Sequence, residues 1–137
     1  MSFDIYLGCF RAGELATFPR KLTVDIFAPC VVTDAEFASN GLEGRHWDLD
    51  NCGYMSLDSD GEEITGFSVN RPPDNDIFWR GIITILQNTT SVLYWGTGAV
   101  VGQTATYAEL PRDLIDGLGE PYLVKVPEDI FEVFRKT

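Results

Sequence analysis

The residue types best suited to nucleophilic or metal chemistry occur together near the middle of the chain. His46 is the only histidine, and Asp48 and Cys52 follow it closely. A catalytic histidine needs a nucleophile beside it and an acid that orients it. A thiol in an acidic segment has its thiolate disfavoured, however, and no Cys-x-x-Cys pair is present to hold zinc. We therefore predict that His46 is a polar surface or turn residue, and we assign no catalytic residue, metal site or cofactor.

A glycine-rich stretch after a predicted strand has the spacing of a phosphate-binding loop. Its glycines are Gly96, Gly98 and Gly102. A phosphate loop needs a helix immediately after the glycines and usually a lysine. Val100 and Val101 stand there instead, so we predict a hairpin turn.

Asp58, Asp60 and Gly61 resemble the start of a calcium-binding loop. In such a loop the sixth position is glycine and the twelfth is a bidentate glutamate. Counting from Asp58, these positions hold Glu63 and Val69, so the ligand pattern fails. We predict an exposed turn.

Acidic residues are concentrated in one part of the sequence. Residues 34–63 contain nine acids and one base, whereas the rest of the chain contains 12 acids and nine bases. Adjacent carboxylates such as Asp48 and Asp50 are both ionised on an exposed ribbon, which does not suit paired acid–base catalysis. Two interpretations remain open: a docking surface for a basic partner, or a solvated face. The candidate partner-binding residues are Trp47, Asp48, Asp50, Asp58, Asp60, Glu62 and Glu63.

The tryptophans allow two roles. Trp47 lies inside the acidic segment and has the type of side chain that anchors protein interfaces. The core is nevertheless the favoured place for Trp47, Trp79 and Trp95 alike.

Length and net charge restrict the class of protein. With 137 residues the chain is predicted to form a single domain over residues 1–137, and 10 basic against 21 acidic residues give a net charge of −11. Such a field repels nucleic acids and anionic membranes. No secretory signal or bilayer-spanning stretch is recognised, so we expect a cytoplasmic protein with reduced cysteines. The oligomeric state stays open.

The first half of the chain is predicted to be mostly strands. Alternating apolar residues predict a strand over 3–10, followed by a turn at 11–14. Pro19 is expected to open a helix that ends before Pro29. The stretch 31–44 is ambiguous, with a short helix possible over 34–39. The remaining strands are predicted at 45–49, 52–57 and 63–70.

In the second half, Asp74 or Asp76 is expected to cap the strongest helix, whose apolar positions run from Phe78 to Leu86. A hairpin over 91–102, short helices over 104–110 and 111–118, a buried strand over 122–126 and a helix from Pro127 complete the chain. Prolines 19, 111 and 127 are expected at the first position of their helices. This order predicts an α+β fold, an antiparallel sheet of hairpins with helices packed on one face.

Several short motifs are spread over nearly the whole chain. They are Phe3-Asp4-Ile5-Tyr6-Leu7 with Phe10, Phe18-Pro19-Arg20, Gly66-Phe67 with Asn70-Arg71-Pro72, Ser91-Val92-Leu93-Tyr94-Trp95 and Leu110-Pro111. With these motifs the chain resembles a group of short, acidic, uncharacterised bacterial proteins, and in size and charge it is similar to the immunity proteins that accompany bacterial toxins. This resemblance implies a cytosolic inhibitor, but it assigns no functional residue.

From the sequence we therefore expect an acidic protein-binding module, such as an immunity-type inhibitor that masks a basic toxin or another basic protein. The alternative is a small enzyme or ligand-binding domain with a pocket that no motif reveals.

Overall fold

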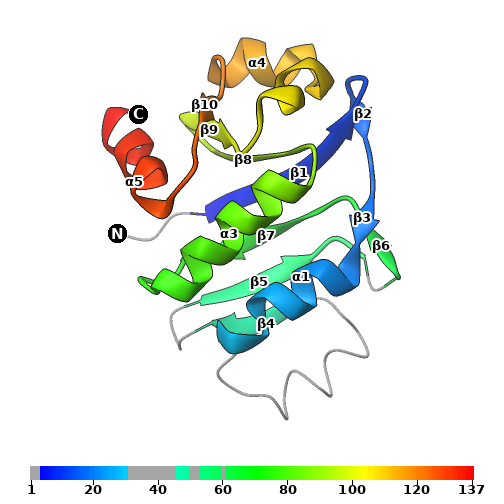
Figure 1. Ribbon diagram of the computed structural model, residues 1–137, viewed down its shortest axis with the longest axis vertical. Coiled ribbons are helices and arrows are strands. Elements are labelled where there is room, and N and C mark those ends of the chain that lie inside the picture. Colours follow the sequence, from blue (N-terminus) through cyan, green and yellow to red (C-terminus); the bar gives the residue numbers. More distant parts are fainter. Residues whose placement is uncertain (1–3, 31–45, 50–52, 60) are drawn as a thin grey trace.

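The protein has the predicted α+β fold, built around one mixed sheet (Figure 1). The computed structural model describes residues 4–30, 46–49, 53–59 and 61–137. All neighbouring strands of the sheet are antiparallel except β10 and β9, which are parallel. In spatial order the strands are β10 (Tyr122–Leu123), β9 (Gly98–Val101), β8 (Ser91–Trp95), β1 (Asp4–Arg11), β7 (Gly66–Asn70), β5 (Gly53–Leu57) and β4 (His46–Leu49).

Two short strand pairings lie outside this order. β2 (Glu14–Leu15) returns along β1 after a turn in which Ala12 and Gly13 both have positive φ. β3 (Phe18–Pro19) pairs with β6 (Glu63–Ile64) as a separate two-stranded sheet.

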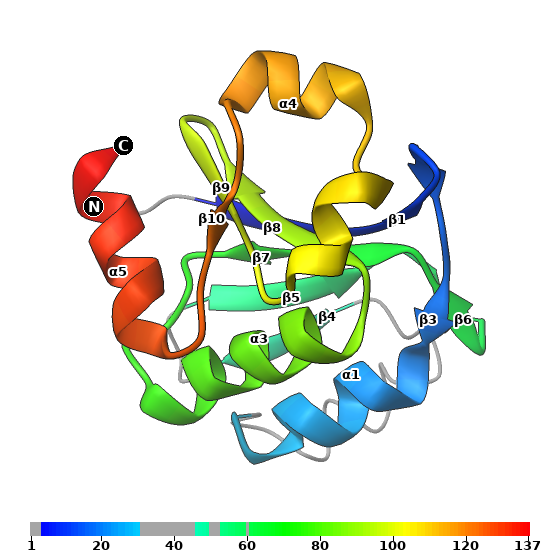
Figure 2. The ribbon, with the colours of Figure 1, turned by 45° about the horizontal axis from the view of Figure 1, so that its top comes forward.

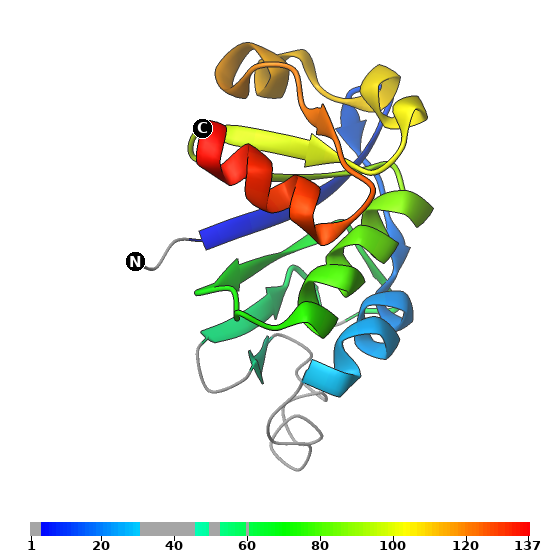
Figure 3. The same ribbon diagram turned by 60° about the vertical axis from the view of Figure 1, so that its left-hand side comes forward.

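Three helices cover one face of the sheet (Figures 1 and 3). Their apolar residues and the inward residues of the strands form the main core, which includes Ile5, Leu7, Phe27, Phe78 and Ile130. A short 3-10 turn follows the first helix. These elements are α1 (Arg20–Phe27), η1 (Ala28–Cys30), α3 (Asp76–Asn88) and α5 (Pro127–Lys136).

The remaining helical segments, η2 (Thr104–Glu109) and α4 (Arg112–Leu118), lie on the opposite face at the β8–β9 end (Figure 2). Neighbouring residues of a strand point to opposite faces. Accordingly, Val92 and Val101 join a second core cluster with Leu110, whereas Leu93 and Val100 belong to the main core.

The structure corrects the predicted strand over 63–70. It is two strands, β6 and β7, which separate at Thr65 and pair with different neighbours. The backbone N–H and the hydroxyl of Thr65 both donate to the carboxylate of Asp58, while the Thr65 carbonyl accepts from the N–H of Cys9. Thr65 is thus the point where the chain leaves the β3 pairing of β6 and joins the β1 pairing of β7.

The predicted buried strand over 122–126 is also wrong in length and burial. Only Tyr122 and Leu123 form β10, and both are exposed. Val124 is buried and donates its N–H to the Val101 carbonyl. The segment therefore touches the sheet at its edge rather than running through the core.

Two predictions about helix starts need correction. Asn75, rather than Asp74 or Asp76, caps α3, because its Oδ1 accepts from the backbone N–H of Ile77 and of Phe78. Of the three prolines, only Pro127 occupies the first helical position. Pro19 and Pro111 are the extended residues just before α1 and α4.

Several predictions fall outside the described residues. These are the possible helix over 34–39, the side chains of Trp47 and Asp48, and the positions of Asp50, Cys52 and Asp60. Within the described part of the chain, no helix is long and apolar enough to cross a bilayer.

Candidate functional site

No metal site is assembled among the described residues. No group of three or more histidine, cysteine and acidic side chains among them is placed to hold a metal ion. Cys9 and Cys30 are buried. The stretch from Gly96 to Gly98 connects β8 to β9 as a hairpin turn, as predicted. A candidate site must therefore be sought on the surface.

The most distinctive surface is the face of β1, β7 and β5 opposite α1 and α3, which we call the open face. Within the described ranges no helix covers this part of the sheet, whereas η2 and α4 cover its β8–β9 end (Figure 2). The strand register sets Tyr6 beside Ser68 on one side and beside Tyr94 on the other, and Ser68 beside Ser56. The open face consists of Asp4, Tyr6, Gly8, Ser56, Gly66, Ser68 and Asn70, and Tyr94 of β8 borders it.

A tyrosine pair forms the aromatic part of the open face. The rings of Tyr6 and Tyr94 are stacked, with centroids 5.5 Å apart and an angle of 27° between the planes. Tyr6 remains 39% exposed. Burial, and secondarily the neighbouring Tyr6, raise the pKa of Tyr94 above its ordinary value. The pair therefore offers a neutral aromatic surface with polar hydroxyls, a combination that is common in interfaces.

Two exposed carboxylates, those of Asp4 and Asp58, are held in place by hydrogen bonds. Asn70 Nδ2 donates to Asp4 Oδ1 at 2.9 Å. The N–H of Thr65 donates to both oxygens of Asp58, at 3.2 and 3.1 Å, and its hydroxyl also donates to Oδ2. Both carboxyl groups are exposed and retain acceptor capacity, because each oxygen can accept about two hydrogen bonds.

A groove of about 380 Å³ runs along the open face. Gly8 and Gly66 are Cα partners across β1 and β7, so no side chain stands on its floor at that point. The Phe10 ring lies over Gly8. A Cβ atom added to Gly8 would be 3.0 Å from the nearest atom of this ring. The groove is lined by Tyr6, Leu7, Gly8, Phe10, Leu15, Ser56, Leu57, Asp58, Thr65, Gly66, Phe67, Ser68 and Tyr94.

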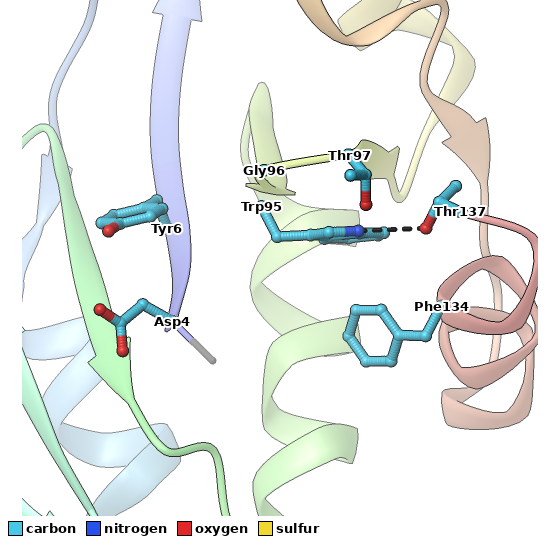
Figure 4. A pocket seen from close by; sticks show the side chains of 7 residues that line it. All are labelled: Asp4, Tyr6, Trp95, Gly96, Thr97, Phe134 and Thr137. Atoms are coloured by element: carbon cyan, nitrogen blue, oxygen red, sulfur yellow. Dashed lines mark hydrogen bonds between the residues drawn. The ribbon is translucent and has the colours of Figure 1, made fainter. Parts of the chain in front are cut away.

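A second hollow, of about 630 Å³, lies at the end of the sheet between β1 and the β8–β9 turn. Figure 4 shows Asp4 and Tyr6 on one side of β1, and Trp95 and Phe134 on the other side. Trp95 Nε1 donates to Thr137 Oγ1 at 3.2 Å, which joins the end of α5 to β8. Tyr6 lines both this hollow and the groove.

The structure divides the candidate acids between two ends of β5. The Cα atom of Asp48 is opposite Tyr54, at the start of β5, whereas Asp58 follows its last residue. At about 3.3 Å per residue these ends are about 13 Å apart. Glu62 and Glu63 are exposed near Asp58, where Glu63 Oε1 accepts from Thr17 Oγ1 at 3.3 Å. Trp47 is opposite Met55 in the register.

Sequence reasoning found Asp58 but missed Asp4, Tyr6, Asn70 and Tyr94. The sequence signal that could have found Tyr6 is the alternation of buried and exposed residues along β1. This alternation sets Tyr6 on the face opposite Ile5 and Leu7. The residues beside Tyr6 depend on which strands pair with β1. These residues lie more than 60 positions away from Tyr6 along the chain.

Comparisons with protein families, with curated proteins and with solved structures found no match for the chain.

Proposed function

We propose that this protein is a binding module that docks on a basic protein through its open face and masks it, as an immunity-type inhibitor masks a toxin. The observation that carries the proposal is the open face itself. It is a section of sheet that no described helix covers, and a stacked tyrosine pair and the carboxylate of Asp58 line its groove. Hydrogen bonds from Asn70 and Thr65 hold the carboxylates of Asp4 and Asp58.

The charge of the chain supports a basic partner. With a net charge of −11, the protein attracts a cationic surface at long range and repels phosphate backbones and anionic lipids. Asp58, Glu62 and Glu63 add local negative charge at one end of the open face. In such complexes electrostatics raise the association rate, while aromatic contacts of the kind that Tyr6 offers slow dissociation.

The proposal is tested by finding the partner and measuring how its association depends on salt. The tagged protein is used to capture candidates from its native cell, and each candidate is then purified and mixed with it in stopped-flow experiments. We expect a basic protein whose association rate falls steeply as the salt concentration rises from about 20 to about 200 mM. Over this range salt increasingly screens the attraction between the two charged proteins. A partner that is acidic, or an association rate that salt leaves unchanged, would reject the proposal.

Charge-neutral variants locate the steering charge. Replacing Asp58, Asp60, Glu62 and Glu63 by Asn or Gln should lower the association rate about tenfold at low salt and change the dissociation rate less. The matched control, D113N/D116N/E120Q/E128Q, removes the same charge from exposed acids on and near α4 and α5. Equal effects of the two variants would show that net charge alone, and not this end of the open face, governs association.

A second candidate function is supported by the hollow beside Trp95. Its volume of about 630 Å³ and its lining by Tyr6, Trp95 and Phe134 suit a small, partly apolar ligand. A ligand-binding domain would show a dose-dependent rise in Tm with members of a panel of nucleotides, sugars and metals. We expect no such rise under the proposed function, and a rise abolished by W95A would favour this alternative.

A further inference from the structure

The groove on the open face has two chemically different walls. One wall is apolar and aromatic: Phe10 and Leu15 are Cα partners across β1 and β2, and Leu15 is 65% exposed. The other part of the lining is polar and includes Asp58, Thr65 and Ser68. Gly8 and Gly66 also line the groove, and the Phe10 ring lies over Gly8. Among the described residues that line the groove, Asp58 is the only charged one.

We propose that this groove is the binding subsite for one arginine side chain of the basic partner. The inference rests on the proposed function and specifies how it is carried out. The arginine methylene groups pack against Leu15 and Phe10, and the guanidinium group reaches the carboxylate of Asp58. A side chain with an apolar stem and a cationic head matches both walls at once.

The geometry of the groove favours arginine over lysine. A planar guanidinium stacks on an aromatic ring and donates two parallel hydrogen bonds to a carboxylate, whereas an ammonium is a compact point charge that is more strongly hydrated. Tyr6 and Tyr94 line the groove, and Asp58 is oriented by two donor groups of Thr65. Both features favour the planar guanidinium group of arginine, which can donate two hydrogen bonds to one carboxylate.

The test uses the full chain, labelled with ¹⁵N, and N-acetyl-arginine amide as the probe. We expect saturable shifts of the backbone amides of Gly8, Thr65 and Gly66, with a dissociation constant on the order of 1 mM for a ligand of this size. N-acetyl-citrulline amide, which has nearly the same shape without the charge, should bind at least about fivefold more weakly, because it forms no charge-assisted hydrogen bond. N-acetyl-lysine amide should also bind more weakly.

Any of three results would overturn the inference: no saturable shift, citrulline binding as tightly as arginine, or shifts confined to Trp95 and Thr97 at the other hollow. Binding of lysine as tight as that of arginine would replace the arginine subsite by a general cation site and would also reject it.

Two variants test separately whether the polar and the apolar part of the groove contribute to arginine binding. D58N should weaken arginine binding about fivefold, while D113N, which removes an exposed charge on α4, should leave it unchanged. Because Asp58 also bonds to Thr65, D58N is accepted only if its spectrum and Tm show a folded protein. Leu15→Ser is a second variant at an exposed position, and it should weaken binding about two- to threefold through the lost apolar contact. Unchanged affinity in both folded variants would refute the subsite.

The two proposals fail separately. If a basic partner binds but N-acetyl-arginine amide does not, only the arginine subsite is wrong. If the amide binds as expected but no basic protein is found to associate, the subsite stands and the proposed function fails.

Discussion

Gly66 lies where β7 approaches β1 most closely. A Cβ atom at this position would overlap the carbonyl oxygen of Leu7, so only glycine fits without a backbone shift. We predict that G66A lowers the free energy of unfolding by about 3 kcal/mol, because the backbone of the central strand pair must move. Chemical denaturation measures this change.

The matched control for G66A is G117A. Gly117 is in α4, and a Cβ there would meet no atom within 4 Å. Because alanine favours the helix, G117A should leave the stability unchanged or raise it by up to about 1 kcal/mol. Equal destabilisation by both substitutions would contradict the assigned close contact.

Tyr94 provides a pH-dependent signal from the open face. Burial and the neighbouring Tyr6 raise its pKa, so the folded state favours the neutral phenol. A raised pKa contributes stability that is fully present below the ordinary tyrosine value and is lost as pH rises through the folded-state pKa. We predict that, in an ultraviolet titration, Y94F removes a component that ionises above about pH 10.

Y94F should also flatten the loss of stability in the same alkaline range. A Y94F titration that superimposes on that of the wild-type protein after scaling for one fewer tyrosine would show that Tyr94 ionises like an exposed residue, against the stacked and partly buried arrangement.

At the level of secondary-structure elements, one side chain, that of Asn75, caps the start of α3. Asn75 Oδ1 accepts from two backbone N–H groups of the first turn, at 2.8 and 3.3 Å. N75A should therefore destabilise the protein by about 1 kcal/mol. D74A, at the exposed neighbouring position, should change stability by less than about 0.5 kcal/mol. Thermal or chemical denaturation of the two variants compares them, and a larger effect of D74A would reassign the cap.

Elements with strong local signals could be predicted from the sequence. The apolar spacing of α3 and the turn between β8 and β9 both identified the correct structure. The division of residues 63–70 at Thr65 could not be predicted, because it depends on β6 pairing with β3 and β7 pairing with β1 and β5, strands that only the folded chain brings together. The length of β10 escaped prediction for the same reason, since contact with β9 sets it.

The candidate site could likewise be predicted from the sequence only in part. An acidic run drew attention to Asp58, Glu62 and Glu63, which lie near one another in the fold. The open face, in contrast, joins Tyr6, Tyr94 and Asn70 from separate strands. Periodicity indicates which residues of one strand share a face, but the order of strands in the sheet decides which residues meet across it.

At the scale of the whole molecule, the two faces of the sheet have different roles. The face under α1, α3 and α5 is closed by the main core, and these helices give the protein its stability. The face over β1, β7 and β5 carries the tyrosine pair, the oriented carboxylates and the groove. Partner binding on this open face is the central claim.

The most direct test is a nuclear magnetic resonance footprint of the ¹⁵N-labelled protein with its purified basic partner. We predict that the amide signals of Tyr6, Gly8, Ser68 and Tyr94 shift or broaden on binding, while those of α1 and α3 stay unchanged. A footprint confined to the helices α1, α3 and α5, with the signals of the open face unmoved, would contradict the account.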